Sequence, residues 1–214
     1  MKKFTLKLML IGVLFFGNSN TMQGAKLTIY NNYEDYVSNQ GIHYEGDFEF
    51  REITKHMSLN AAKFRNVDKE HGERRVKVKL WVVWGFQFGD HLFRVTEKYD
   101  VPVYVRQEGS LIYYENGAAI LRMLKLGKSL DQDTYSYETK TTRPPVVMDS
   151  SLITASMFVS KTLKSRIYPF SPKEKKKLIE LLPEIAAVYE CLDGSVGIQM
   201  KRSRMCFDEV IKAP

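Results

Sequence analysis

The sequence is poor in long hydrophobic runs and in cysteine, and each shortage excludes a class of protein. The longest apolar stretch, residues 8–16, includes one glycine and is about half the length of roughly 20 residues that a bilayer-spanning helix needs. We therefore expect no transmembrane segment in the working protein. The two cysteines, Cys191 and Cys206, match no zinc pattern, because such a site needs further ligands close by.

The motifs that usually mark an enzyme are absent as well. The chain contains no Gly-x-Ser-x-Gly turn for a serine nucleophile, no Ser-x-x-Lys pair and no phosphate-binding glycine loop. Its four histidines are far apart, and none has a partner at the spacing of a metal-ligand pair (His43, His56, His71 and His91). We predict no cofactor, no metal site and no catalytic residue from these patterns.

The first 25 residues have the three parts of a secretory signal peptide. Lys2, Lys3 and Lys7 form a basic flank, residues 8–16 an apolar core, and small or polar residues follow. We expect cleavage after Ala25, with cleavage after Ser19 as the alternative. Residues 17–25, which directly follow the apolar core, contain no cysteine, so we expect no lipid-modified N-terminus. We expect the protein in the periplasm or outside the cell.

The charge of the expected mature chain, residues 26–214, is modest. The whole chain has a net charge of +7, and it loses three lysines but no acid with the signal peptide, which leaves +4. This charge and the predicted export argue against a nucleic-acid partner. A lysine-rich stretch, residues 161–177, predicts at most a weak contact with an anionic envelope surface and otherwise a solvated helix face.

Residues 46–55 and 76–126 show the alternation of apolar and polar side chains that is typical of strands. The pattern begins at 46–55 and is clearest from Val76 onward, whereas 56–75 is polar and predicts a loop. Gly89-Asp90 and Asn116-Gly117 each indicate a hairpin. We therefore predict an antiparallel meander over 76–126, with 118–126 as its last strand and one further strand at 135–140.

Helix signals lie near both ends of the mature chain. Asn31-Asn32 followed by two acids predicts a short helix that ends by Gly41, and spaced apolar residues predict an amphipathic helix over 148–163. Ser171-Pro172 begins another helix, which Pro183 should kink or split. We expect Asp193-Gly194 to end it, and a strand and a last helical turn in the tail.

Together these elements predict an α+β protein with one domain at 26–214. We expect a central antiparallel meander of five or six strands, with a short N-terminal helix and two or three C-terminal helices on one face. Residues 46–140 should be mainly β and residues 148–192 mainly helical.

Two small sets of residues are candidates for a site or a covalent link. Aromatic side chains in strands are usually core, but at a surface they bind sugars or apolar ligands, and both interpretations stay open for Trp81, Trp84, Phe86 and Phe88. Cys191 and Cys206 are expected either to form a disulfide, favoured by an oxidising compartment, or to remain buried thiols.

Three segments resemble exported proteins of unknown function from Bacteroidetes-type bacteria. These are Tyr33-Glu34-Asp35-Tyr36-Val37, then Trp84-Gly85-Phe86 with Gly89 and Phe93-Arg94-Val95, and finally Gly109 through Gly117. They cover less than half of the chain. The resemblance implies export and a β-meander with terminal helices, and it brings no catalytic residues.

Two functions fit these observations. The first is a non-enzymatic module of the cell envelope or of secretion that binds a protein, a glycan or an apolar ligand. The second is a hydrolase of envelope polymers, which needs two carboxylates that meet in a cleft. Glu49, Glu52, Glu115 and Asp90 are its candidates, although charged residues in strands usually face solvent.

Overall fold

The computed structural model describes residues 24–56, 59–68, 72, 74–127, 130, 157–192 and 200–212. Nearly all of the predicted signal peptide, the predicted strand at 135–140, the first part of the predicted helix at 148–163 and the expected helix end at Asp193-Gly194 lie outside these residues. None of the helices in the described ranges is long and apolar enough to cross a membrane.

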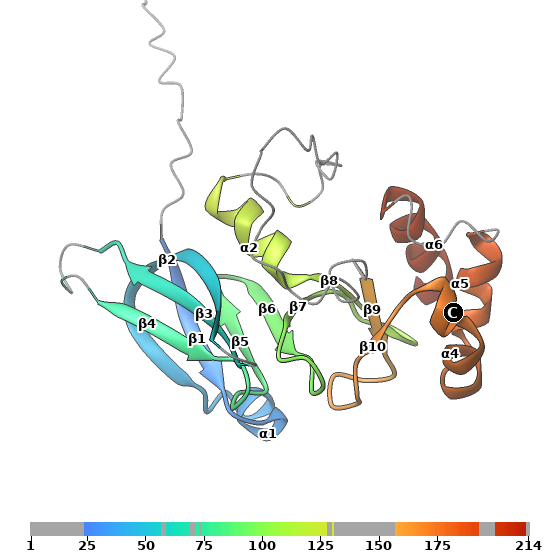
Figure 1. Cartoon of the computed structure of the whole chain (residues 1–214), viewed down its shortest axis with the longest axis horizontal. Coiled ribbons are helices and arrows are strands. Elements are labelled where there is room, and N and C mark those ends of the chain that lie inside the picture. Colours follow the sequence, from blue (N-terminus) through green and yellow to red (C-terminus); the bar gives the residue numbers. More distant parts are fainter. Residues whose placement is uncertain are drawn as a thin grey trace, which may run out of the picture.

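The fold is α+β and is built on one antiparallel sheet of ten strands (Figure 1). The order across the sheet is β10-β9-β8-β7-β6-β5-β1-β2-β3-β4, so β4 and β10 are the edges. The strands are β1 (Ala25–Tyr30), β2 (Ile42–His56), β3 (Leu59–Asn66), β4 (Arg75–Lys79), β5 (Gly85–Phe88), β6 (His91–Val95), β7 (Pro102–Gln107), β8 (Ile112–Asn116), β9 (Met157–Ser160) and β10 (Tyr168–Pro169). The helices are α1 (Tyr33–Val37), α2 (Gly117–Lys125), the 3₁₀ turn η1 (Pro172–Glu174), α4 (Lys175–Leu181), α5 (Ile185–Cys191) and α6 (Met200–Lys212).

Several local signals have the predicted effect. The Asn32 side chain caps α1 by accepting from the Asp35 backbone N–H at 2.8 Å. Gly89 adopts φ +61° in the turn that joins β5 to β6, a conformation that costs glycine little. Pro183 separates α4 from α5, because proline supplies no backbone N–H.

The prediction of a strand at 118–126 is wrong, because this segment is helix α2. The Asn116 side chain accepts from the backbone N–H groups of Ala118 and Ala119, at 3.1 and 3.3 Å, and so caps a helix. Gly117 does not adopt a positive φ. A Cβ at this position would lie 2.5 Å from the Pro102 carbonyl oxygen, so the glycine permits a close approach to β7.

The sheet has ten strands instead of the predicted five or six, and two other segments differ from their predictions. Residues 59–66 form β3 instead of a loop. The sequence pattern does not indicate this strand, because it buries small or polar side chains such as Ala62 and Asn60. Residues 157–160 form β9 instead of the end of a helix. All four residues of β9 are buried, and a fully buried strand shows no alternation by which sequence could distinguish it from a buried helix.

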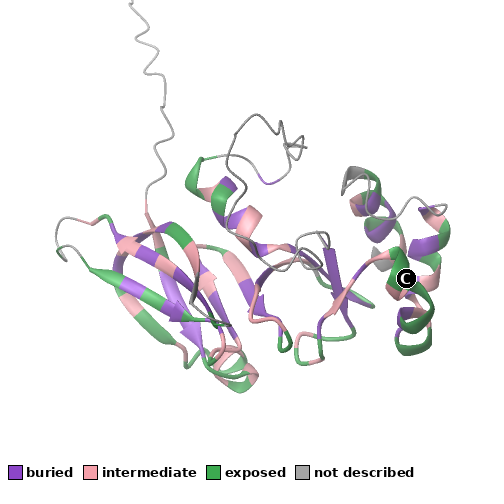
Figure 2. Cartoon of the chain, in the orientation of Figure 1, coloured by how far each residue is buried: buried purple, intermediate pink, exposed green. Residues whose placement is uncertain are grey.

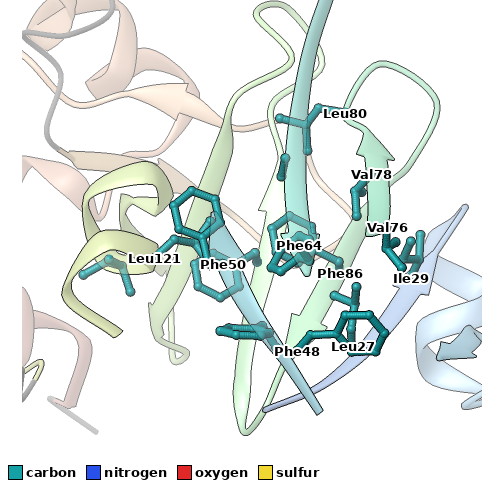
Figure 3. Close-up of a cluster of buried hydrophobic side chains, with 14 of the residues drawn as sticks. Leu27, Ile29, Phe48, Phe50, Phe64, Val76, Val78, Leu80, Phe86 and Leu121 are labelled. Atoms are coloured by element: carbon teal, nitrogen blue, oxygen red, sulfur yellow. The ribbon is translucent and has the colours of Figure 1, made fainter. Parts of the chain in front are cut away.

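Strands β1 to β6 curve around the first hydrophobic core, and we call this curved part of the sheet the curl (Figure 2). Side chains of β1 to β6 meet there, and Ile120 and Leu121 of α2 join them. Phe64 of β3 is central in this cluster (Figure 3): its ring centroid lies 5.7 Å from that of Phe86 and 5.2 Å from that of Phe88. Phe64 therefore packs β3 against β5, although β1 and β2 lie between these two strands in the sheet.

The second core lies between the sheet and the C-terminal helices. Leu178, Ile185 and Phe207 of α4, α5 and α6 pack with residues of β8 and β9, and the Phe207 ring stacks on that of Tyr113 at 4.2 Å. In Figure 1 these helices lie at the opposite end of the molecule from β4. The sheet thus has a different hydrophobic cluster toward each of its ends.

Cys191 and Cys206 connect α5 to α6. Their sulfur atoms lie at bonding distance, 1.99 Å, and their Cα atoms are 5.7 Å apart. The structure therefore favours the disulfide over two separate thiols.

Replacing both cysteines by alanine is expected to lower the free energy of unfolding by about 3 kcal/mol, the value for a closed loop of some 15 residues. Urea unfolding followed by circular dichroism measures the change, and the wild-type protein in reductant should lose a similar amount. An unfolding midpoint that reductant leaves unaltered would show that the bond does not form.

Candidate functional site

The structure separates the four candidate aromatic residues into two pairs. Phe86 and Phe88 are fully buried in the first core. Trp81 and Trp84 are half-buried and lie in and just after the turn that follows β4. Of these four residues, the two tryptophans line a hollow in the described part of the chain, and the two phenylalanines do not line it.

The hollow has a volume of about 440 Å³ and is lined by five segments of the chain. These segments are the start of α1, the turn between β4 and β5, the end of β6, the turn between β6 and β7, and the loop after β9. The polar and aromatic residues that line it are Asn31, Asn32, Tyr33, Glu34, Trp81, Trp84, Arg94, Thr96, Glu97, Asp100 and Lys164.

Backbone hydrogen bonds fix the position of Trp84. Its N–H donates to the Tyr30 carbonyl at 3.0 Å, and its carbonyl accepts from the Val95 N–H at 2.9 Å. Trp84 thereby continues the pairing of β5 with β1 and β6 by one residue. The tryptophan is held at the end of three strands, directly beside α1.

A tight turn places two carboxylates at the same hollow. The Thr96 N–H donates to the Val101 carbonyl at 3.0 Å and closes the turn between β6 and β7. Asp100 adopts φ +50° in this turn, a conformation that aspartate tolerates better than most residues. Glu97 and Asp100 both line the hollow as a result.

The Trp84 ring is part of an aromatic cluster that includes an arginine. The Tyr36 ring stacks on it at 5.3 Å, and the Tyr33 ring meets it edge-on at 5.6 Å. The Arg94 guanidinium lies over the Trp84 ring at 4.7 Å, which is a favourable cation–π distance. These contacts hold helix α1 against the sheet and fix the orientation of the indole.

Arg94 is a buried charge, with a side chain only 2% exposed. It donates to the carbonyl oxygens of Leu163 and Ser165, and to a Glu97 carboxylate oxygen at 3.0 Å. The other Glu97 oxygen accepts from the Ile167 N–H at 3.4 Å. Arg94 and Glu97 therefore tie the loop after β9 to the wall of the hollow.

Two buried donors of this site have no acceptor among the described residues. Trp84 Nε1 and Arg94 Nε are both inaccessible to solvent, and no atom in the described ranges accepts a hydrogen bond from them. A buried donor that has lost water without gaining an acceptor costs roughly 1–3 kcal/mol. Both residues line the hollow, but these two nitrogen atoms do not reach its surface.

The carboxylates of the hollow differ in their partners. Lys164 donates to Glu34 at 2.7 Å, and this hydrogen bond lowers the pKa of Glu34. Glu97 is held by Arg94. Burial raises the pKa of Asp100, and no cation within the described residues forms an ion pair with it.

The carboxylates that the sequence proposed for hydrolysis do not meet at this hollow. Glu49 pairs with Arg51 and Arg65, and Glu52 pairs with Lys63, on the outer strands of the curl. Glu115 is buried beside α6, where Arg204 binds it, and Asp90 lies exposed in the β5–β6 turn. Within the described residues, no three His, Cys, Asp or Glu side chains are placed to hold a metal ion.

Sequence reasoning named Trp81 and Trp84 as candidates, and it named none of the other residues that line the hollow as a candidate. Arg94 occurs in an ordinary alternating strand, and Lys164 lies some 70 residues further along the chain. The one available signal was the charge of Arg94 at a position between the apolar residues Phe93 and Val95. Comparison of this chain with protein-family models, with curated proteins and with solved structures finds no match.

Proposed function

We propose that the protein is an exported, non-enzymatic binding module of the envelope or the secreted fraction, and that the hollow beside α1 is its binding site. The observation that carries this proposal is the placement of both tryptophans of the chain at one hollow, beside the buried side chain of Arg94. Pockets that bind ligands combine aromatic walls with a few polar groups at fixed positions.

The rigidity of the site supports binding. Trp84 is fixed by backbone pairing and ring contacts, and Arg94 by hydrogen bonds to the loop after β9. A site that is already formed loses little conformational entropy when a ligand enters. The walls therefore need only small changes to receive a ligand.

The proposed compartment rests on two features. The first 25 residues have the composition of a signal peptide, and the disulfide between Cys191 and Cys206 is of the kind that persists in oxidising compartments. Strand β1 begins at Ala25, so cleavage after Ser19 leaves it whole and cleavage after Ala25 removes one residue. Lys173, Lys175, Lys176 and Lys177 are exposed and would supply any weak contact with an anionic surface.

Photo-crosslinking in the cells that make the protein tests both the site and the compartment. A photoreactive amino acid replaces Val82, which lines the hollow and is 56% exposed. The matched control replaces Leu181, an apolar residue of α4 that is 48% exposed. We expect an adduct from position 82 that is absent from position 181, on a chain trimmed near Ala25.

Mass spectrometry of the tagged full-length protein identifies the adduct and the N-terminus. Equal labelling from positions 82 and 181, or none from position 82, would contradict the site. An untrimmed chain in the cytoplasm would contradict export. These two readings are independent of each other.

The alternative is a hydrolase of envelope polymers, and one observation favours it. Asp100 has a raised pKa and shares the hollow with Glu34 and Glu97, and a proton donor of this kind is what polymer hydrolysis requires. The ion pairs of Glu34 and Glu97 with cations argue against it, because neither carboxylate is free to act as a base. Product formation from purified envelope polymers that Asp100→Asn abolishes would establish the hydrolase.

A further inference from the structure

Strand β4 is an edge of the sheet and pairs with β3 alone. Directly after β4, the Leu80 N–H donates to the Asn60 carbonyl of β3 at 3.0 Å. Hydrogen-bonded and non-bonded positions alternate along an antiparallel pair of strands, so every second residue of β4 continues this bonding to β3. The backbone groups of Lys77 and Lys79 lie at the positions between, and they therefore point away from β3 toward the open edge.

Three of these outward backbone groups have no hydrogen-bond partner within the described residues. They are the N–H and the carbonyl of Lys77 and the N–H of Lys79, whereas the Lys79 carbonyl accepts from the Val82 N–H at 3.1 Å. Both lysines are exposed. Unpaired backbone groups along an exposed edge are the surface to which a further strand adds.

The side chains of β4 make this edge cationic. Exposed and buried residues alternate along the strand (Figure 2), and the exposed ones are Arg75, Lys77 and Lys79. No carboxylate in the described part of the chain forms an ion pair with Lys77 or Lys79. The outer face of β4 thus carries positive charge that these residues do not neutralise.

The neighbouring strand adds to this charge. Lys63 of β3 lies directly opposite Lys77, and Arg65 lies opposite Arg75. Like charges at opposite positions of two strands repel each other. The Lys63 ammonium already binds Glu52 of β2 at 2.8 Å, so the charges run negative, positive, positive from β2 to β4. A carboxylate on a strand beyond β4 would balance the last of them.

Lysine at an edge also restricts which strands can add to a sheet. A second copy of this chain would place its own β4 lysines beside Lys77 and Lys79, and like charges on adjacent strands repel. A basic strand is excluded for the same reason. An anionic polysaccharide or lipid supplies charge but no row of amide groups spaced to match the unpaired backbone groups of β4. An acidic strand supplies both.

We propose that the edge of β4 binds an extended acidic segment of a partner protein, which adds to the sheet as a further strand. The backbone of this segment pairs with the N–H and carbonyl of Lys77 and with the N–H of Lys79. Its alternate Asp or Glu side chains lie beside Arg75, Lys77 and Lys79. None of the residues that line the hollow beside α1 belongs to β4, and neither proposal requires the other.

Fluorescence anisotropy of labelled peptides tests the proposal with the purified protein. The probe is an eight-residue peptide with Glu at every second position and Thr or Val between, titrated at low ionic strength, where charges are least screened. One matched peptide has Lys in place of each Glu. Another keeps every Glu but carries N-methyl groups on its backbone amides, which removes the donors that a strand needs. We expect the Glu peptide to bind at least tenfold more tightly than either.

Two double variants assign the binding to β4. Lys77→Glu with Lys79→Glu should weaken the Glu peptide at least tenfold and should bind the Lys peptide instead, a gain that misfolding cannot produce. Lys173→Glu with Lys176→Glu makes the same change of charge at exposed positions of η1 and α4 and should leave the Glu peptide bound. Because Lys77→Glu sets a carboxylate opposite Lys63, the β4 variant should unfold at no lower a urea concentration than the wild type.

The other outcomes overturn the proposal. Equal binding of the N-methylated peptide shows attraction by charge alone, without an added strand. A galacturonate hexasaccharide that displaces the Glu peptide at an equal or lower concentration identifies an anionic polysaccharide as the occupant. A dimer in sedimentation that the β4 variant dissociates identifies a second copy of this chain. No binding of the Glu peptide shows that the lysines only protect the edge.

Discussion

Replacing Phe64 by alanine is expected to lower the free energy of unfolding by about 3–5 kcal/mol, the usual cost of removing a buried aromatic ring. Phe64 is 1% exposed. Its ring contacts those of Phe50, Phe86 and Phe88, on β2 and β5. The loss has two causes: apolar area returns to water, and a cavity remains where β3 packs across the curl onto β5.

Chemical unfolding followed by far-ultraviolet circular dichroism measures this effect, and two variants provide its scale. Phe64→Leu keeps most of the apolar volume and should cost less than Phe64→Ala. Leu59→Ala changes an apolar residue on the same strand that is 39% exposed, and it should cost about 1 kcal/mol or less. Equal losses for Phe64→Ala and Leu59→Ala would show that the curl lacks the core described above.

Replacing Arg204 by methionine should also destabilise the protein by about 3–5 kcal/mol. Arg204 binds the Glu115 carboxylate through two hydrogen bonds, from Nε at 2.6 Å and from a terminal nitrogen at 2.8 Å. The Glu115 side chain is 0% exposed. Methionine leaves this buried carboxylate with the Tyr113 hydroxyl, which donates to it at 3.3 Å, and with the more distant Arg106, whose Nε lies 3.9 Å away.

A second substitution distinguishes the buried charge from simple loss of packing. Glu115→Leu combined with Arg204→Met removes both charges and should recover much of the stability, because an apolar pair often replaces a buried ion pair without loss. Unfolding curves of the two single variants and the double variant complete the cycle. A double variant as unstable as the sum of the single losses would contradict a coupled pair.

The Glu115–Arg204 pair also explains part of the fold that sequence reasoning did not reach. The tail was expected to form a strand and one helical turn, but Met200–Lys212 is a helix of 13 residues. Phe207 and Cys206 of this helix are buried against β8 and α5. These contacts, together with the ion pair, stabilise a helix in which six of the 13 residues are charged.

Local signals were reliable where the chain itself supplies the bonding partner. Asn32 caps α1 by accepting from a backbone N–H three residues further along the chain, and Gly89 lies in the turn between the adjacent strands β5 and β6. The Asn116-Gly117 pair is compatible with two local structures, a hairpin turn and the start of a helix. The side chain of Asn116 caps a helix as readily as it fits a turn, and the approach of β7 to Gly117 is not a local property.

The sequence by itself determined the class of the fold, the hairpin at Gly89, the helix break at Pro183 and the two tryptophans as candidates. Each follows from propensity or from periodicity within some 15 residues. Only the tertiary structure decided that β3 and β9 are strands and that Trp84, Arg94 and Lys164 line one hollow. These residues come from segments up to 80 residues apart, and the pairing of strands that joins them depends on which surfaces bury each other.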